Sequence, residues 1–260
     1  MLRGPMASLR AEAVTFDCWN TLLYEVDPSL AHIRRVEALA RAASRPGAIV
    51  EPEAAHAALE RAWLRHIALW QEGVCSGARE VAAWSLGALG AGEEGAPELA
   101  RAFAEAALET RIEPLEGAGL TLEGLAAAGV RRALICDTGF SPGRVVRHLL
   151  ERAGLLRWLE VLVFSDEQGV PKPHRRMFES ALAPLRVAPG AAVHVGDLRR
   201  TDVAGARGAG LRTVRIRHLH DDQTDLAEAD WVAESHAHLR ELLGLGGSGP
   251  ARGIPQLRSS

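Results

Sequence analysis

The stretch AVTFDCWNT, residues 13–21, anchors the expected fold of this 260-residue chain. Residues 13–16 form a short apolar run with β-branched side chains, which predicts a buried strand ending just before Asp17. In open parallel sheets, ligands bind beside the carboxyl ends of the strands. Asp17 is therefore the first candidate functional residue.

Downstream of residue 113, apolar runs alternate with segments of helical character. We expect strands at 133–136, 159–164, 191–195, 211–216 and 231–233, and helices at 120–128, 142–153, 173–185, 202–209 and 236–243. Such alternation predicts an α/β fold, with a parallel sheet covered by helices on both faces. The strand at 13–16 would belong to the same sheet.

The region between residues 30 and 111 has a different character, because it is rich in Ala, Leu, Glu and Arg with helical spacing. One apolar stripe runs through Ala55, Ala58, Leu59, Ala62 and Trp63. Clusters of Gly and Pro divide the region into about four helices. We therefore predict a core domain of residues 1–22 and 113–245, a helical bundle inserted at 23–112, and a disordered tail at 246–260.

Composition narrows the class of protein. The net charge of −3 gives no reason to expect a nucleic-acid partner, and the sequence contains no apolar run of about 18 residues that could span a membrane. Residues 1–13 lack the apolar core of a signal peptide. Cys18, Cys75 and Cys136 show no metal-binding or disulfide spacing, so we expect a reducing, cytoplasmic compartment.

Polar residues follow several of the expected strands, and their carboxyl ends should meet at one edge of the sheet. After the strands come Asp17; Cys136, Asp137 and Thr138; Lys172 in the loop GVPKP; and Asp197, with Asp202 five residues later. Carboxylates suit Mg²⁺, and backbone N–H groups at a helix start suit an anion. The set therefore indicates phosphoryl transfer with an aspartate as the nucleophile.

Lys172 is the only lysine among the 30 basic residues. A lysine ammonium is a compact point charge, whereas an arginine guanidinium is a planar fork, so the two do not replace each other at a tight site. The retention of one lysine at this sheet edge is either chance or a functional requirement.

Three motifs in this order resemble those of the haloacid dehalogenase-like (HAD) superfamily. They are FDCWNTL at 16–22, the Lys172-Pro173 loop, and Gly196-Asp197 followed after four residues by Asp202, and the resemblance extends from residue 12 to about 243. It implies a Rossmann-like core, and the helical insertion resembles the superfamily's C1-type cap.

The resemblance also implies roles for individual residues. Asp17 would be the nucleophile that forms an aspartyl-phosphate, and Lys172 would bridge it to the phosphoryl oxygens. Mg²⁺ would be held by Asp17, Asp197 and the backbone carbonyl of Trp19, with Asp202 supporting the metal site or Lys172 from behind. The residues assigned to phosphate binding are Thr21, Cys136, Asp137 and Thr138.

Two positions depart from the superfamily's pattern. Trp19 stands where HAD phosphatases carry an acid/base aspartate, a function typically worth about 10²–10⁴-fold in rate. Cys136 stands where Ser or Thr usually begins the phosphate-binding turn, and Thr138 or the backbone N–H groups are expected to compensate. Alkyl phosphates are therefore expected to be poor substrates.

The predicted function is a Mg²⁺-dependent hydrolase acting on a small phosphorylated metabolite. Two alternatives stay open: a metal-independent 2-haloacid dehalogenase-like hydrolase, which also has an aromatic residue at the Trp19 position but usually lacks the Gly-Asp-(x4)-Asp acids, and a non-catalytic HAD-fold binding protein. The phosphonatase branch of the superfamily needs a lysine in the cap to form a Schiff base. Residues 23–112 contain no lysine, which argues against this branch.

The remaining candidates are expected to be structural. Trp63, Trp70 and Trp84 are predicted to lie in the core of the bundle. Arg199 and Arg200 are predicted to form a solvated face, and His174, His218 and His220 are predicted to be surface residues. No part of 24–112 indicates a specific substrate pocket.

Overall fold

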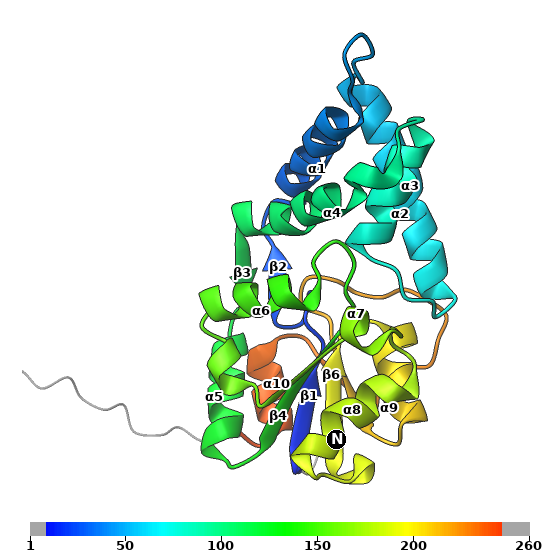
Figure 1. The fold of residues 1–260 in the computed structure, drawn as a ribbon. Helices are drawn as coiled ribbons and strands as arrows, with labels where there is room; N and C mark the ends of the chain where they lie inside the picture. The colour runs from blue at the N-terminus through cyan, green and yellow to red at the C-terminus, as the bar shows by residue number, and fades with distance from the viewer. Residues whose placement is uncertain (1–8, 246–260) are drawn as a thin grey trace, which may run out of the picture.

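The computed structural model describes residues 9–245 and contains a six-stranded, fully parallel sheet in the order β5-β4-β1-β6-β7-β8 (Figure 1). The strands are β1 (Ala13–Phe16), β4 (Arg131–Cys136), β5 (Val161–Phe164), β6 (Ala192–Gly196), β7 (Arg212–Ile216) and β8 (Trp231–Ala233). β1 pairs with β4 on one side and β6 on the other. The predicted α/β fold with a Rossmann-like parallel sheet is confirmed.

The two faces of the sheet are buried under different helices, because successive side chains of a strand point to opposite faces. Val14 and Phe16 of β1 belong to the core that includes residues of α5 (Ala118–Ala127), α6 (Gly143–Arg152) and α10 (His236–Leu242). Ala13 packs on the other face, in the core beneath α8 (Arg175–Leu185) and α9 (Ala204–Gly208). β1 is thereby held at the centre of the domain, with Asp17 at its end.

The helix expected at 202–209 is replaced by a π-helical turn, Arg199–Val203, followed by the short α9. The amides of Asp202 and Val203 both donate to the carbonyl of Leu198. The Asp202 carboxylate in turn accepts from the Leu198 amide at 3.0 Å, which directs it into the protein. The π-helical turn therefore helps to position the Asp202 carboxylate. Such turns often occur at functional sites.

Two further segments differ from the sequence prediction. A short helix α7 (Ser165–Gln168) follows β5, and α8 begins at Arg175, so Lys172 lies in the intervening loop. An antiparallel pair, β2 (Leu23–Glu25) and β3 (Ile112–Pro114), was not expected, because strands of three residues carry too little periodicity to detect.

A helical bundle of α1 (Pro28–Ala43), α2 (Pro52–Gln71), α3 (Ala78–Ala88) and α4 (Ala96–Glu105) lies above the carboxyl edge of the sheet (Figure 1). Within the described residues, four α-helices therefore occupy the region where about four were expected. The helical bundle has an apolar core of its own, which includes Leu39, Leu59, Leu86 and Phe103. The chain enters and leaves the bundle through β2 and β3, side by side.

The expected disordered tail at 246–260 lies outside the described residues. Within 9–245, no helix combines the length and the apolar character needed to cross a lipid bilayer.

Candidate active site

Three side chains from distant parts of the chain meet at the carboxyl edge of the sheet. The Nζ atom of Lys172 donates to Oδ1 of Asp17 at 2.5 Å and to Oδ1 of Asp202 at 2.7 Å. Asp17 is 7% exposed and Lys172 2% exposed. The single lysine is therefore buried between two carboxylates, at the edge where the sequence predicted it.

On the side away from the cavity, Asp202 is held by a chain of hydrogen bonds to residues of β6 and β1. Nε2 of His194 lies 3.2 Å from Oδ1 of Asp202, and Nδ1 of His194 lies 2.8 Å from Oγ1 of Thr15. Burial lowers the pKa of His194, so the ring is neutral, with Nε2–H donating to Asp202 and the Thr15 hydroxyl donating to Nδ1. Sequence reasoning missed His194, although a polar residue inside the apolar run 191–195 was a usable signal.

The Lys172–Asp202 pair is ionised. Burial opposes the charge on Asp202, but the charge of Lys172 and the hydrogen bond from His194 hold the pKa of this carboxyl well below its usual range. Burial likewise opposes the charge on Lys172, yet Asp17 and Asp202 raise its pKa well above the ordinary value. Asp202 thus neutralises and positions the lysine.

The ionisation of Asp17 and Asp197 is opposed by their surroundings. Burial, together with neighbouring carboxylates, raises the pKa of Asp17 to about 7 and that of Asp197 to about 8. Asp197 is 3% exposed, and Nδ2 of Asn20 donates to its Oδ2 at 3.4 Å. Lys172 contacts Asp17 but not Asp197, so a further cation between the two acids would favour the ionised form of both.

This donor set fits a divalent cation that prefers oxygen. One ligand atom from each of Asp17, Asp197 and Asp202 lies within 4.8 Å of the others. Because Asp202 already accepts from Lys172, His194 and Leu198, the carboxylates free to ligate are those of Asp17 and Asp197. Hard carboxylate oxygens are what Mg²⁺ takes.

The residues predicted to bind phosphate separate into two groups. Asp137 and Thr138 line the cavity, whereas Thr21 and Cys136 are fully buried behind its wall. The Thr138 amide donates to Oγ of Ser165 at 2.8 Å, and Oγ1 of Thr138 lies 3.1 Å from Oδ1 of Asp166. The amide and the hydroxyl of Thr138 are therefore already occupied by hydrogen bonds within the protein.

The backbone beyond Thr138 offers free donors. Within residues 9–245, the amides of residues 139–141 donate to no other group. Gly139 and Phe140 both line the cavity, immediately before the N-terminus of α6. Such amides form an anion site without charged side chains.

A cavity of about 550 Å³ lies between this sheet edge and the helical bundle. Sequence reasoning found no pocket residues in 24–112. The structure places these bundle side chains in its wall: His32, Arg35, Leu59, Glu60, Trp63, His66, Ile67 and Trp70. These residues could not be predicted because they depend on how the bundle packs over the sheet. The helical periodicity of the sequence contains no information on that packing.

Trp70 corrects one sequence prediction, because it contacts the core domain rather than lying in the bundle's own core. Its Nε1 donates to Oδ2 of Asp137 at 2.8 Å, and the amide of Lys172 donates to Oδ1 of the same carboxylate at 2.8 Å. The Arg200 guanidinium stacks 3.9 Å from the Trp70 ring centroid, so the prediction of a solvated face is wrong for Arg200. Trp84, as expected, packs against the bundle's core.

Arg35 supplies a buried cation to the cavity wall. Its Nε donates to the carbonyl of Phe103 at 3.0 Å, and its guanidinium lies 4.2 Å from the centroid of Phe140. Burial lowers the pKa of Arg35 to about 10, which leaves it charged at neutral pH. An anionic substrate group could therefore be recognised from the bundle side.

His66 supplies a titratable group to the same wall. Its Nδ1 lies 2.8 Å from Oγ of Ser76, and its ring stacks on Trp63 with centroids 4.6 Å apart. Burial lowers the pKa of His66, so the imidazole is neutral at pH 7. A Cβ on Gly139 would lie 2.9 Å from the Trp63 ring and 3.2 Å from Nε2 of His66, so glycine lets the turn approach α2.

The parallel sheet, the acid after its first strand and the buried lysine–aspartate cluster define an enzyme-like α/β domain with its candidate site at the carboxyl edge of the sheet. A family model described as haloacid dehalogenase-like hydrolase matches residues 11–210. The chain belongs to this family, as its motifs predicted.

Curated relatives of this chain include phosphatases. Phosphoserine phosphatase of Thermus thermophilus is 37% identical over 175 residues, which cover 62% of this chain and 64% of that protein. The pyrimidine 5′-nucleotidase YjjG of Escherichia coli is 35% identical over 147 residues, covering 56% of this chain and 63% of that protein. Each match thus spans less than two thirds of the relative's length.

Among solved structures, a HAD phosphatase from Thermococcus onnurineus superposes with a TM-score of 0.63 and 23% identity. The superposition covers 89% of this chain and 97% of that structure. At this level of identity the likeness concerns the fold.

Proposed function

We propose that this chain is a Mg²⁺-dependent phosphohydrolase that acts on a small phosphorylated metabolite through an aspartyl-phosphate on Asp17. The observation that carries the proposal is the buried contact of Asp17 with Lys172, with Asp197 beside them in the wall of the cavity. The phosphatase relatives support the same class of substrate.

In the first step, a carboxylate oxygen of Asp17 attacks phosphorus, and the bond from phosphorus to the ester oxygen breaks. In the second step, water attacks the phosphorus of the acyl phosphate, releases inorganic phosphate and regenerates Asp17. Lys172, positioned by Asp202, neutralises the phosphoryl oxygens in both steps.

Mg²⁺ would be held by Asp17, Asp197 and the backbone carbonyl of Trp19, and would withdraw charge from the phosphoryl oxygens. The amides of residues 139–141 would bind phosphoryl oxygens directly. Thr138 would hold that turn through Ser165 and Asp166, and Asp137 would fix the Lys172 backbone. Cys136 and Thr21 would act as buried supports of the same edge.

The helical bundle would be the cap, of the C1 type, that selects the substrate. The bundle's contribution of Arg35, His66 and Trp70 to the cavity wall supports this assignment. The domain division would then be 1–22 and 113–245 for the core and 23–112 for the cap.

The test is a screen for phosphate release over phosphorylated metabolites, with Mg²⁺ and with a chelator. Asp17→Asn should abolish release, because the amide is a poor nucleophile. Asp225→Asn makes the same chemical change at an exposed position and should be active. Release that survives Asp17→Asn, or that does not depend on metal, would exclude the proposal.

A metal-independent 2-haloacid dehalogenase-like activity is the second candidate, because Trp19 replaces the usual acid. Asp17 would then displace halide from carbon, and Asp197 would have no metal to hold. Halide release from 2-chloropropionate in the presence of a chelator would favour this reading. If neither assay shows turnover and thermal shift finds a tight ligand, the chain is a binding protein.

A further inference from the structure

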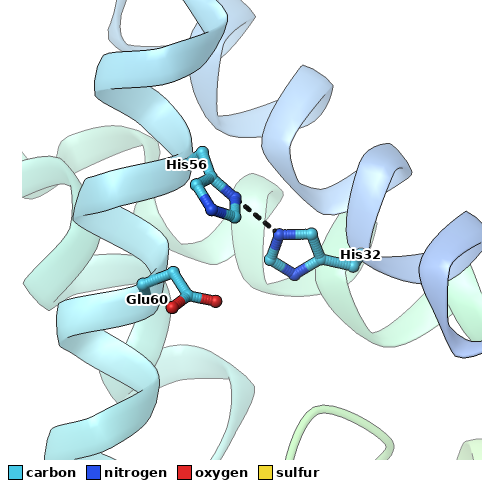
Figure 2. A group of neighbouring side chains, drawn as sticks. All are labelled: His32, His56 and Glu60. Atoms are coloured by element: carbon cyan, nitrogen blue, oxygen red, sulfur yellow. Dashed lines mark hydrogen bonds between the residues drawn. The ribbon is translucent and has the colours of Figure 1, made fainter.

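Two histidines and a glutamate come together on the helical bundle (Figure 2). His32 belongs to α1, and His56 and Glu60 belong to α2. Nε2 of His32 lies 2.8 Å from Nδ1 of His56. One ligand atom from each of the three residues lies within 4.8 Å of the others.

The sequence and the packing of the bundle create this grouping. His56 and Glu60 are four residues apart on α2, so they project from the same helix face one turn apart. α1 packs against α2 through the apolar core that contains Leu39 and Leu59. This packing brings His32 opposite that face, and Figure 2 shows all three side chains turned toward the space between the helices.

We propose that His32, His56 and Glu60 form a binding site for a transition-metal ion of the Zn²⁺ type, separate from the carboxylate site at Asp17. Two imidazole nitrogens and one carboxylate oxygen are a donor set that suits Zn²⁺ and its neighbours. Mg²⁺ instead takes oxygen ligands, so the two sites differ in the metal they prefer.

The separations suit an ion after small side-chain rotations. With ligand bonds of about 2.0–2.1 Å, tetrahedral donor atoms lie about 3.3 Å from one another. The two imidazole nitrogens already lie at hydrogen-bond distance, and Glu60 is exposed on the surface of α2. The backbones of α1 and α2 need not move.

The protonation of the two rings also suits ligation. In the His32–His56 hydrogen bond, one ring nitrogen carries the shared proton and the other accepts it. When a metal replaces that bond, the proton moves through solvent to the outer nitrogen of the same ring, so both imidazoles stay neutral and no net charge is lost. Burial and the neighbouring His56 lower the pKa of His32, which favours the neutral form that ligates.

The position of the site relates it to the cavity. His32 and Glu60 line the cavity, whereas His56 is exposed to solvent. Three protein ligands leave at least one coordination position open, as in zinc sites that bind a further ligand. An ion here would connect α1 to α2 and add positive charge to the cavity wall near Arg35. Glu60 offsets part of that charge.

The test is a calorimetric titration of the untagged, chelator-treated chain with ZnCl₂ in a large excess of Mg²⁺, which competes at the carboxylate site. We expect one equivalent of Zn²⁺ to bind. Because loss of even an outer partner costs 10–100-fold in metal affinity, His56→Gln and His32→Gln should each weaken binding by about 100-fold. Glu60→Gln should weaken binding as well.

The matched control is His148→Gln, which removes an exposed histidine that also has a nearby glutamate, Glu151, on its own helix. It should bind Zn²⁺ as the wild type does. Co²⁺ gives a second readout, because a four-coordinate Co²⁺ ion absorbs visible light much more strongly than one in an octahedral all-oxygen site. This absorption should be lost in His56→Gln.

Equal Zn²⁺ affinity in the wild type and His56→Gln, or Co²⁺ spectra that His56→Gln does not change, would overturn the proposal. The site is independent of phosphate release, so Asp17→Asn should keep its Zn²⁺ affinity. Failure of this proposal therefore leaves the proposed function untouched, and the reverse also holds.

Discussion

Lys172 shows how strongly a single residue is constrained at this sheet edge. Its ammonium is 2% exposed and makes contacts of 2.5 Å and 2.7 Å with two carboxylates. A guanidinium is larger and planar, so it cannot occupy the same point between Asp17 and Asp202. This geometry favours lysine over arginine at position 172, which holds the one lysine among the 30 basic residues.

The first prediction is that Lys172→Arg loses activity although it keeps the charge. Misplacing one stabilising donor typically costs about 10²–10³-fold in kcat, and we expect a loss of that size in phosphate release. Arg176→Lys, the reverse exchange at an exposed position, should be neutral. Circular dichroism would verify folding, and full activity of a folded Lys172→Arg would show that the lysine is there by chance.

The second prediction concerns proton donation at Trp19, whose indole cannot protonate a leaving group. Aryl and acyl phosphates, whose leaving groups need little protonation, should be cleaved much faster than alkyl phosphates. Steady-state kinetics on a matched series would measure the difference. Comparable rates would mean that another residue donates the proton, a function typically worth about 10²–10⁴-fold.

The sequence was sufficient to predict the site residues that follow the ends of strands. It was not sufficient to predict the residues that hold those site residues in place through hydrogen bonds. Asp17, Lys172 and Asp202 were expected together because parallel strands end at one edge. His194 was missed because its role depends on a hydrogen bond across β1 and β6, and strand neighbours are a tertiary property. Thr138 was placed at the site, but its engagement by Ser165 requires α7, which the sequence did not predict.

At the scale of elements, α2 has two functions on different faces. One face carries Ala55, Ala58 and Leu59 into the bundle's core, which the apolar stripe predicted. The cavity side carries Trp63, the last residue of that stripe, and Trp70, seven residues further along, and large aromatic side chains leave this pattern ambiguous. From the sequence alone, an aromatic residue on a helix can be assigned either to the apolar core or to a cavity wall. The choice depends on which element packs against that face of the helix.

The third prediction is that Trp70→Phe weakens the contact between α2 and the core. Phenylalanine keeps an aromatic face for Arg200 but removes the Nε1–H that donates to Asp137 at 2.8 Å. A hydrogen bond to a charged group is worth about 1.5–3 kcal/mol, so kcat/KM for phosphate release should fall by about tenfold or more.

Trp84→Phe is the matched control, because Trp84 packs against the bundle's core, stacks with Arg65 and, within residues 9–245, does not line the cavity. It should leave kcat/KM unchanged. If both variants behave alike, the Trp70–Asp137 bond does not position the site.

At the scale of the whole molecule, the fold followed from the order of its segments. Right-handed crossovers and short connections leave few arrangements for alternating strands and helices, so the parallel sheet could be predicted. The β2–β3 pair could not, although it carries both chain crossings into the bundle. How the bundle sits over the sheet, and hence the cavity, depends on contacts between distant segments such as Trp70 with Asp137.

The fourth prediction concerns His236, which connects α10 to the segment that follows Asp17. Its Nε2 lies 2.8 Å from the carbonyl of Thr21, and its Nδ1 lies 3.1 Å from Oγ1 of Thr121. Since a carbonyl only accepts, Nε2 carries the proton and the neutral ring fits the site. Burial lowers the pKa of His236 from 6.5 to about 4. Between these two pH values the unfolded chain binds the proton and the folded chain does not.

The free energy of unfolding should therefore fall as the pH falls from about 6.5 to about 4, by on the order of 3 kcal/mol from this one histidine. His236→Gln keeps an amide donor for Thr21 and cannot titrate, so urea unfolding across this pH range should show a smaller loss in the variant. Subtracting the two curves cancels the contributions of Asp17, Asp197 and the other histidines. His218→Gln, at an exposed position, should retain the wild-type slope. Parallel curves for wild type and His236→Gln would mean that the folded chain binds this proton as readily as the unfolded chain, so that burial does not lower the pKa of His236.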